Sequence, residues 1–146
     1  MRINLFEEQV IDGKMTFLNF TPATTFYSKD QLRYERRYIY AFRCDRFIKI
    51  GQSIDVAKRM EALQRSNPFE IQHIGKRRVP IRAVTYAEAW AHSQMGTPIR
   101  GEWFDGNGKS DSEIRQILGE AFKRGRVYDR LCSHPTPSAC VQGGAL

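Results

Sequence analysis

The sequence predicts a small α+β layer in which helices flank a central sheet. Two short segments rich in β-branched and aromatic residues follow each other closely at residues 37–51. Three later stretches show the apolar spacing of helices, and another strand-like segment lies between the first two of them. The predicted order is therefore strand, strand, helix, strand, helix, short apolar segment, helix.

The chain has 146 residues, which suffices for one domain with additional chain at its ends. We assign residues 1–37 to an N-terminal extension, where Asp12-Gly13 between two short apolar segments predicts a β-hairpin. We assign residues 38–125 to the folded domain. The helical pattern then ends, and the stretch HPTPSACVQGGAL is rich in Pro, Gly, Ser and Ala, so residues 126–146 are predicted to be a disordered tail.

The first half of the domain is predicted to hold three strands and a helix. RYIYAFRC at 37–44 and FIKIG at 47–51 predict two strands, and the short link between them favours an antiparallel hairpin. SIDVAKRMEALQRSNP predicts a helix that Ser53 caps and that ends before Pro68. FEIQHIGKRRV at 69–79 predicts a third strand, with imperfect alternation of apolar and polar residues.

The second half of the domain is predicted to be mainly helical. A helix follows Pro80 through AVTYAEAWAHSQM, and GEWF at 101–104 is a short apolar segment. A third helix starts near Ser110, which has capping-box spacing to Glu113. Its apolar stripe consists of Ile114, Ile117, Leu118, Ala121 and Phe122.

The chain is basic, with a formal net charge of +7 and a pI near 9.6. A basic excess favours polyanionic partners, because each neutralised phosphate releases a counterion. Basic residues gather in two places, and both are candidate nucleic-acid-binding surfaces. They are Arg33, Arg36 and Arg37 in the extension, and Lys76, Arg77, Arg78 and Arg82 around the end of the third strand. The alternative is that both are solvated faces without a nucleic-acid partner.

The sequence predicts a cytoplasmic protein without a membrane partner. No apolar run approaches the ~20 residues that span a bilayer. The amino terminus MRINLFEEQV carries two acids and lacks the apolar core of a signal peptide. The three cysteines predict neither zinc nor a disulfide framework, because no CxxC or histidine pair accompanies them.

Four segments of the domain, taken in order, resemble the GIY-YIG nuclease superfamily. YIY at 38–40 and KIG at 49–51 resemble its paired naming motif, and KIG is typical of its phage-ORF and meiotically up-regulated-gene subgroup. KRMEALQRSNP, the E-x-x-x-H spacing that begins at Glu88, and GEWF continue the resemblance. It covers the chain from about Tyr38 to Phe104. It implies a three-stranded, mostly antiparallel sheet flanked by helices.

The resemblance also implies a function, namely metal-dependent hydrolysis of DNA phosphodiester bonds with Mg²⁺ or Mn²⁺. Tyr40 would lie near the attacking water, Arg59 would face the phosphate, and Glu88 would bind the metal. Lys49 stands where other subgroups have a second tyrosine. His92 lies one turn beyond Glu88 on the same helix face and is a candidate phosphate contact. The expected partner is DNA, and RNA is left open.

The chemistry of these residue types agrees with that assignment. Tyrosine is a poor base while its pKa is near 10, so Tyr40 needs a neighbouring cation, and Lys49 could provide one across the hairpin. The guanidinium of Arg59 offers a forked donor for phosphate oxygens. Glu88 offers a hard oxygen ligand for magnesium, which takes only one or two carboxylates. Alternatively, Tyr40 is a half-buried strand tyrosine and Lys49 a solvent-facing strand lysine.

The two helix residues have structural alternatives as well. Arg59 could pair with Asp55, four positions earlier. Glu88 stands at capping-box spacing from Thr85, so its carboxylate could satisfy the start of the helix instead of a metal. His92 could equally be a structural histidine.

Other positions leave the activity open. Glu102 and Trp103 are expected mainly to close the core. Ala91 and Met95 stand where the family has larger aliphatic and aromatic residues, and Asn107 is an uncertain counterpart of an asparagine used by some members.

The sequence is therefore compatible with three candidate functions. The first is the metal-dependent endonuclease, and the second is a catalytically inactive DNA-binding module of the same fold from a phage or mobile element. The third is an interaction domain whose basic faces are only solvated. Retention of the four candidate catalytic residues favours the first over the second, and the charge favours both over the third.

Overall fold

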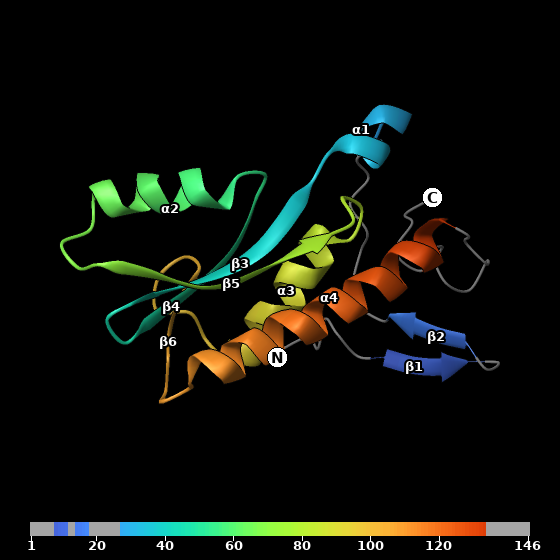
Figure 1. The fold of residues 1–146 in the computed structure, drawn as a ribbon. Coiled ribbons are helices and arrows are strands. Elements are labelled where there is room, and N and C mark those ends of the chain that lie inside the picture. Colours follow the sequence, from blue (N-terminus) through green and yellow to red (C-terminus); the bar gives the residue numbers. More distant parts are fainter. Residues whose placement is uncertain (1–7, 12–13, 18–26, 134–146) are drawn as a thin grey trace.

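The computed structural model describes residues 8–11, 14–17 and 27–133. Its main sheet has four antiparallel strands in the order β5-β3-β4-β6 (Figure 1). These strands are β3 (Arg37–Cys44), β4 (Phe47–Ser53), β5 (Ile71–Val79) and β6 (Trp103–Asp105). The predicted fold class is confirmed. The sheet contains one strand more than expected, because the end of GEWF pairs with the start of β4.

Helices cover both faces of this sheet (Figure 1). Helix α2 (Val56–Arg65) lies on one face, and α3 (Val84–Met95) and α4 (Asp111–Ser133) lie on the other. The N-cap of α2 is Asp55, whose side chain accepts a hydrogen bond from the Lys58 amide. The expectation of Ser53 as the cap is therefore wrong, because this residue still belongs to β4.

The N-terminal extension contains the predicted hairpin. Strands β1 (Glu8–Ile11) and β2 (Lys14–Phe17) pair antiparallel, while the predicted Asp12-Gly13 turn lies outside the described residues. A short helix, α1 (Lys29–Tyr34), follows and was not predicted. Ser28 begins it with a capping box.

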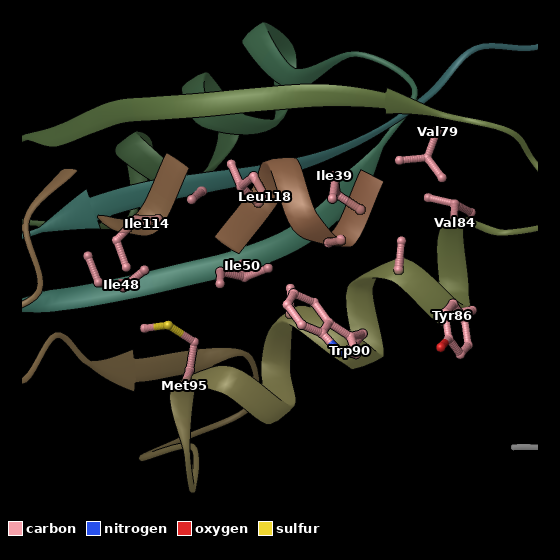
Figure 2. Packing of buried hydrophobic residues seen from close by; sticks show 14 of the residues in the cluster. Ile39, Ile48, Ile50, Val79, Val84, Tyr86, Trp90, Met95, Ile114 and Leu118 are labelled. Carbon is pink, nitrogen blue, oxygen red and sulfur yellow. The ribbon is translucent and has the colours of Figure 1, made fainter. Parts of the chain in front are cut away.

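Strand alternation separates a larger apolar core from a smaller cluster beneath α2. Ile39, Ala41, Ile48 and Ile50 point toward α3 and α4, as Figure 2 shows for three of them. Their neighbours along the same strands point the other way, toward α2. The larger core also contains residues of both covering helices, among them Val84, Tyr86, Trp90, Met95, Ile114 and Leu118.

A bulge explains the imperfect alternation of the third predicted strand. The register between β3 and β5 shifts between Ala41 and Phe42, so that Ala41 pairs with Gly75 and Phe42 with His73. The extra residue, Ile74, is thereby turned into the larger core, whereas Ile71 packs in the smaller cluster beneath α2.

Helix α4 is longer than predicted. Ser110 caps it through its hydroxyl and the Glu113 amide, as expected, but the helix continues to Ser133. The expectation that residues 126–146 form a disordered tail is therefore wrong for 126–133, while 134–146 lie outside the described residues. Within the described part, the helices lack the combination of length and apolar character that crossing a bilayer requires.

Gly125 explains why the sequence predicted that this helix ends too early. A Cβ on this residue would lie 3.1 Å from Val79 Cγ1 and 3.3 Å from the Ala87 Cβ. The glycine therefore permits close packing of α4 on α3 and β5 instead of ending the helix. Beyond it, the ring of Tyr128 stacks on Tyr86, with 4.6 Å between centroids.

Candidate active site

The candidate site lies along β4, just beyond the residues that pair with β6. Strand β6 pairs only with residues 47–49 of β4. At the next position, the Ile50 amide donates to the Glu102 carbonyl at 3.4 Å, and the Ile50 carbonyl lies 2.7 Å from Nε2 of His92. The segment before β6 and helix α3 therefore both meet β4 at this edge.

Tyr40 lies on the α2 side of β3 and is 1% exposed. Its hydroxyl interacts electrostatically with Arg59, which α2 places above the strand. Burial raises the pKa of Tyr40, and Arg59 opposes only part of this increase. The cation beside Tyr40 is therefore Arg59 rather than Lys49, so the predicted pairing of Tyr40 with Lys49 is wrong.

Gly51 makes room for this arrangement. It pairs with Tyr40 across the β3–β4 ladder. A Cβ at this position would lie 2.6 Å from the Tyr40 hydroxyl oxygen and 3.1 Å from Oε2 of Glu102. Both distances are shorter than ordinary van der Waals contact, so a side chain at residue 51 would displace the two oxygens.

Lys49 is buried instead of facing solvent. Its Nζ lies 3.1 Å from Oε2 of Glu102 and 5.6 Å from the centroid of the Trp103 ring. Burial alone would raise the pKa of the Glu102 carboxyl, but the hydrogen bond and charge of Lys49, with smaller contributions from Glu88 and His92, lower that pKa. Lys49 thus holds Glu102 as a carboxylate.

Glu88 is inside α3 and does not cap it. The N-cap is Ala83, and within the described structure no side chain caps this end of the helix. The capping alternative for Glu88 is therefore wrong. Its carboxyl group approaches Gln52 and Glu102. Burial, followed by the charge of Glu102, raises the pKa of Glu88 to about 7.

One oxygen of Glu88 has no partner of ordinary hydrogen-bond geometry. Glu88 is 8% exposed, and its Oε2 has no such partner among the described residues. The other oxygen, Oε1, lies 3.7 Å from Nε2 of His92. Buried polar atoms are rarely left without a partner, so this oxygen has capacity to accept a further hydrogen bond or a ligand.

His92 is fixed by the backbone of β4. Because the Ile50 carbonyl can only accept, Nε2 of His92 must carry the proton and donate it at 2.7 Å. The ring packs at 5.2 Å from the Phe104 ring. This N–H is therefore already engaged in a hydrogen bond with Ile50. That favours the structural alternative for His92 over the predicted phosphate contact.

A hollow of about 500 Å³ opens beside the site. Gln52 and Arg59 line both the hollow and the site, and three basic residues face one acid around it. The lining consists of Arg37, Gln52, Ser53, Ile54, Asp55, Lys58, Arg59 and Ala62. This excess of positive charge suits an anionic chain.

The predicted basic clusters do not form one continuous surface. Near the hollow, Arg37 pairs with Glu35 at 2.8 Å, and Lys76 lies over the Tyr38 ring. Arg77 instead lies over Phe122 of α4, on the opposite face. The remaining basic residues are Arg33, which lies over Tyr34, the exposed Arg36 and Arg78, and Arg82, which pairs with Asp129.

Sequence reasoning missed Gln52 and Gly51, and it treated Glu102 as a core residue. The strand pairing was the available signal for Gly51, since a two-residue link places this glycine opposite Tyr40. The contact between Glu102 and Glu88 joins segments that only the folded chain brings together, so the sequence carried no signal for it.

The protein is thus an α+β domain in which Tyr40, Lys49, Arg59 and Glu88 come together around β4. A family model described as the T5orf172 domain matches residues 37–121, from the start of β3 into α4. Because this range exceeds half of the chain, the protein belongs to the T5orf172 domain family. No curated protein and no solved structure matches it.

Proposed function

We propose that the protein is a metal-dependent endonuclease of the GIY-YIG superfamily that hydrolyses DNA phosphodiester bonds. The observation that carries the proposal is the meeting of Tyr40, Arg59 and Glu88, which come from three different elements. Membership of the T5orf172 family, which is associated with nuclease-type phage proteins, supports it.

Glu88 is the residue that would hold Mg²⁺ or Mn²⁺. In the described residues, no cluster of three or more His, Cys, Asp or Glu side chains is arranged to bind a metal. Magnesium usually keeps several waters, however, and needs only one or two carboxylates. The buried Oε2 without a partner supports a cation here. When bound, such a cation lowers the pKa of water and offsets negative charge on the phosphate.

The exposure of Arg59 beside the hollow supports a role as a phosphate ligand. It is exposed on α2, and its guanidinium reaches from the hollow to the Tyr40 hydroxyl. A planar fork of N–H donors matches the oxygens of a phosphodiester, and donors of this kind stabilise charge that develops during hydrolysis.

Tyr40 would orient the attacking water. Because its pKa is raised, the hydroxyl keeps its proton at neutral pH and acts as a hydrogen-bonding group rather than as a free base. The ladder pairing with Gly51 and stacking on Phe42, at 4.3 Å between centroids, hold the ring in place.

Plasmid cleavage tests the proposal. Supercoiled DNA is incubated with Mg²⁺ or Mn²⁺ and the wild type, Glu88→Gln, Arg59→Ala or Arg65→Ala. Arg65→Ala is the matched control, because Arg65 is exposed at the far end of α2 and pairs with Glu61 at 3.1 Å. We expect nicking by the wild type and the control, and losses of at least about 100-fold in the two site variants.

DNA binding is measured in parallel by fluorescence anisotropy at two salt concentrations. Binding that weakens with salt, without cleavage by the wild type in either metal, would contradict the endonuclease and favour the inactive DNA-binding module. Binding that does not respond to salt would contradict both.

A further inference from the structure

We infer that Glu102 is the second carboxylate of the cation site and that Lys49 holds it there. The inference rests on the proposed function, which assigns the cation to Glu88 alone. It concerns the glutamate of the GEWF segment, which precedes β6 in the chain.

Glu102 is bound to β4 by a backbone hydrogen bond and by an ion pair of its side chain. Its carbonyl oxygen accepts from the Ile50 amide at 3.4 Å, and Oε2 lies 3.1 Å from Nζ of Lys49. Lys49 is itself buried at 6% exposure, whereas the Glu102 side chain is 41% exposed. The carboxylate is therefore held in a defined position and remains accessible to solvent.

Three acidic or phenolic groups contribute oxygens to one location. A Cβ on Gly51 would lie within 3.1 Å of both the Tyr40 hydroxyl and Oε2 of Glu102, so these two oxygens flank the same point. The carboxyl group of Glu88 contacts that of Glu102. Glu88 also contributes the buried Oε2 that has no partner among the described residues.

Two carboxyl groups in contact need positive charge between or beside them, because like charges at this distance repel strongly. Lys49 supplies one positive charge, which offsets one of the two carboxylates when both are ionised. A divalent cation would offset the other carboxylate and leave one positive charge toward an anionic phosphate, and carboxylate oxygens are the ligands that Mg²⁺ and Mn²⁺ prefer. The unpartnered Glu88 oxygen is then explained as a ligand.

The structural alternative gives Glu102 a different role. It would serve only as the ion-pair partner of Lys49 and as a link between β6 and β4. On that view, replacing its carboxylate by an amide weakens the link with Lys49 but leaves cation binding to Glu88 unchanged.

Direct Mn²⁺ binding separates the two roles without any measurement of catalysis. The full chain is titrated with Mn²⁺ in the absence of DNA, and free Mn²⁺ is quantified by electron paramagnetic resonance. The proteins are the wild type, Glu88→Gln, Glu102→Gln and the control Glu113→Gln, which changes an exposed acid in the first turn of α4. We expect the first two variants each to bind at least about 10-fold more weakly, and the control to bind as the wild type does.

Wild-type affinity in Glu102→Gln, with weakened binding in Glu88→Gln, would overturn the inference and leave the proposed function standing. Absence of Mn²⁺ binding by the wild type would also overturn it, whereas plasmid cleavage decides the proposed function separately. If Glu102→Gln does not fold, as judged by circular dichroism, Glu102→Asp takes its place. It keeps the charge on a side chain one methylene shorter, so weaker Mn²⁺ binding supports the inference and unchanged binding contradicts it.

Discussion

The two faces of the four-stranded sheet bury different kinds of residue, although the same strands supply both. Toward α3 and α4, β3 and β4 present isoleucines to a large apolar cluster. Toward α2, they bury the polar groups of Tyr40 and Lys49 beside Gly51, next to a smaller apolar cluster that includes Phe42, Cys44 and Val56.

In a domain of this size, packing on one face of the sheet can fix the position of a polar site on the other. Alternation along a strand gives the site residues Tyr40 and Lys49 apolar neighbours on the opposite face. Tyr40 stands between Ile39 and Ala41, and Lys49 between Ile48 and Ile50. Packing on the apolar face therefore fixes the backbone from which the polar side chains extend.

The largest expected effect belongs to the apolar face. Leu118→Ala should lower the free energy of unfolding by roughly 2–5 kcal/mol, because Leu118 is 1% exposed and its truncation leaves a cavity. Urea denaturation measures this change. Cleavage by the folded variant should stay near that of the wild type at low temperature, and loss of cleavage in fully folded protein would contradict the separation of the faces.

The carboxyl group of Glu88, which α3 brings to the edge of β4, should make stability depend on pH. In metal-free protein, burial raises the pKa of Glu88 to about 7, so the folded state holds a proton that the unfolded state releases near its ordinary pKa. Stability should therefore fall as pH rises from roughly 4.5 to 7, by up to roughly 3 kcal/mol.

Glu88→Gln should remove this part of the pH dependence, because an amide does not titrate in that range. Urea denaturation with a chelator present, at pH 5 and at pH 8, measures the effect in both proteins. An equal loss of stability in wild type and variant would show that Glu88 is not the responsible group.

Gly51→Ala tests the geometry of the polar face. The new Cβ would lie 2.6 Å from the Tyr40 hydroxyl oxygen and must displace it. A displacement of about 1 Å can cost about 100-fold in rate, and we expect a loss of that order in cleavage. The control is Gly75→Ala, where the nearest atom is a flexible side-chain carbon of Arg115 at 3.2 Å. Similar activity in the two variants would contradict the role assigned to Gly51.

The smallest effect should come from Ser110, which caps α4 at the border of the apolar face. Ser110→Ala removes the acceptor of the Glu113 amide and should cost about 1 kcal/mol. Thermal denaturation should show a small decrease in Tm. Cleavage by this variant should match that of the wild type, and a loss would link α4 to the site.

Most of the fold could be predicted, because local patterns decide it. The β3–β4 hairpin, the three helices of the domain and the cap at Ser110 follow from propensity and short-range spacing. Strand β6 could not be predicted, because three residues carry too little pattern. The length of α4 could not be predicted for another reason. Glycine after a helical run usually marks the end of the helix, whereas Gly125 lies inside α4 and allows close packing.

The site was predictable at the level of residue type but not of pairing. The motifs indicated Tyr40, Arg59 and Glu88, and the structure brings these residues together. Which cation faces which oxygen depends on where α2 and the segment before β6 lie over β4. These are tertiary distances, so the sequence could not indicate that Arg59 contacts Tyr40 while Lys49 contacts Glu102.

The short β6 strand also affects how the protein behaves in solution. An unpaired strand edge offers hydrogen-bonding groups to other chains and promotes aggregation. Beyond residue 49, the amide and carbonyl of Ile50 are occupied instead by the Glu102 backbone and the His92 ring. The same residues that border the site therefore shield β4 from intermolecular pairing. Substitutions at His92 should be judged for solubility as well as for activity.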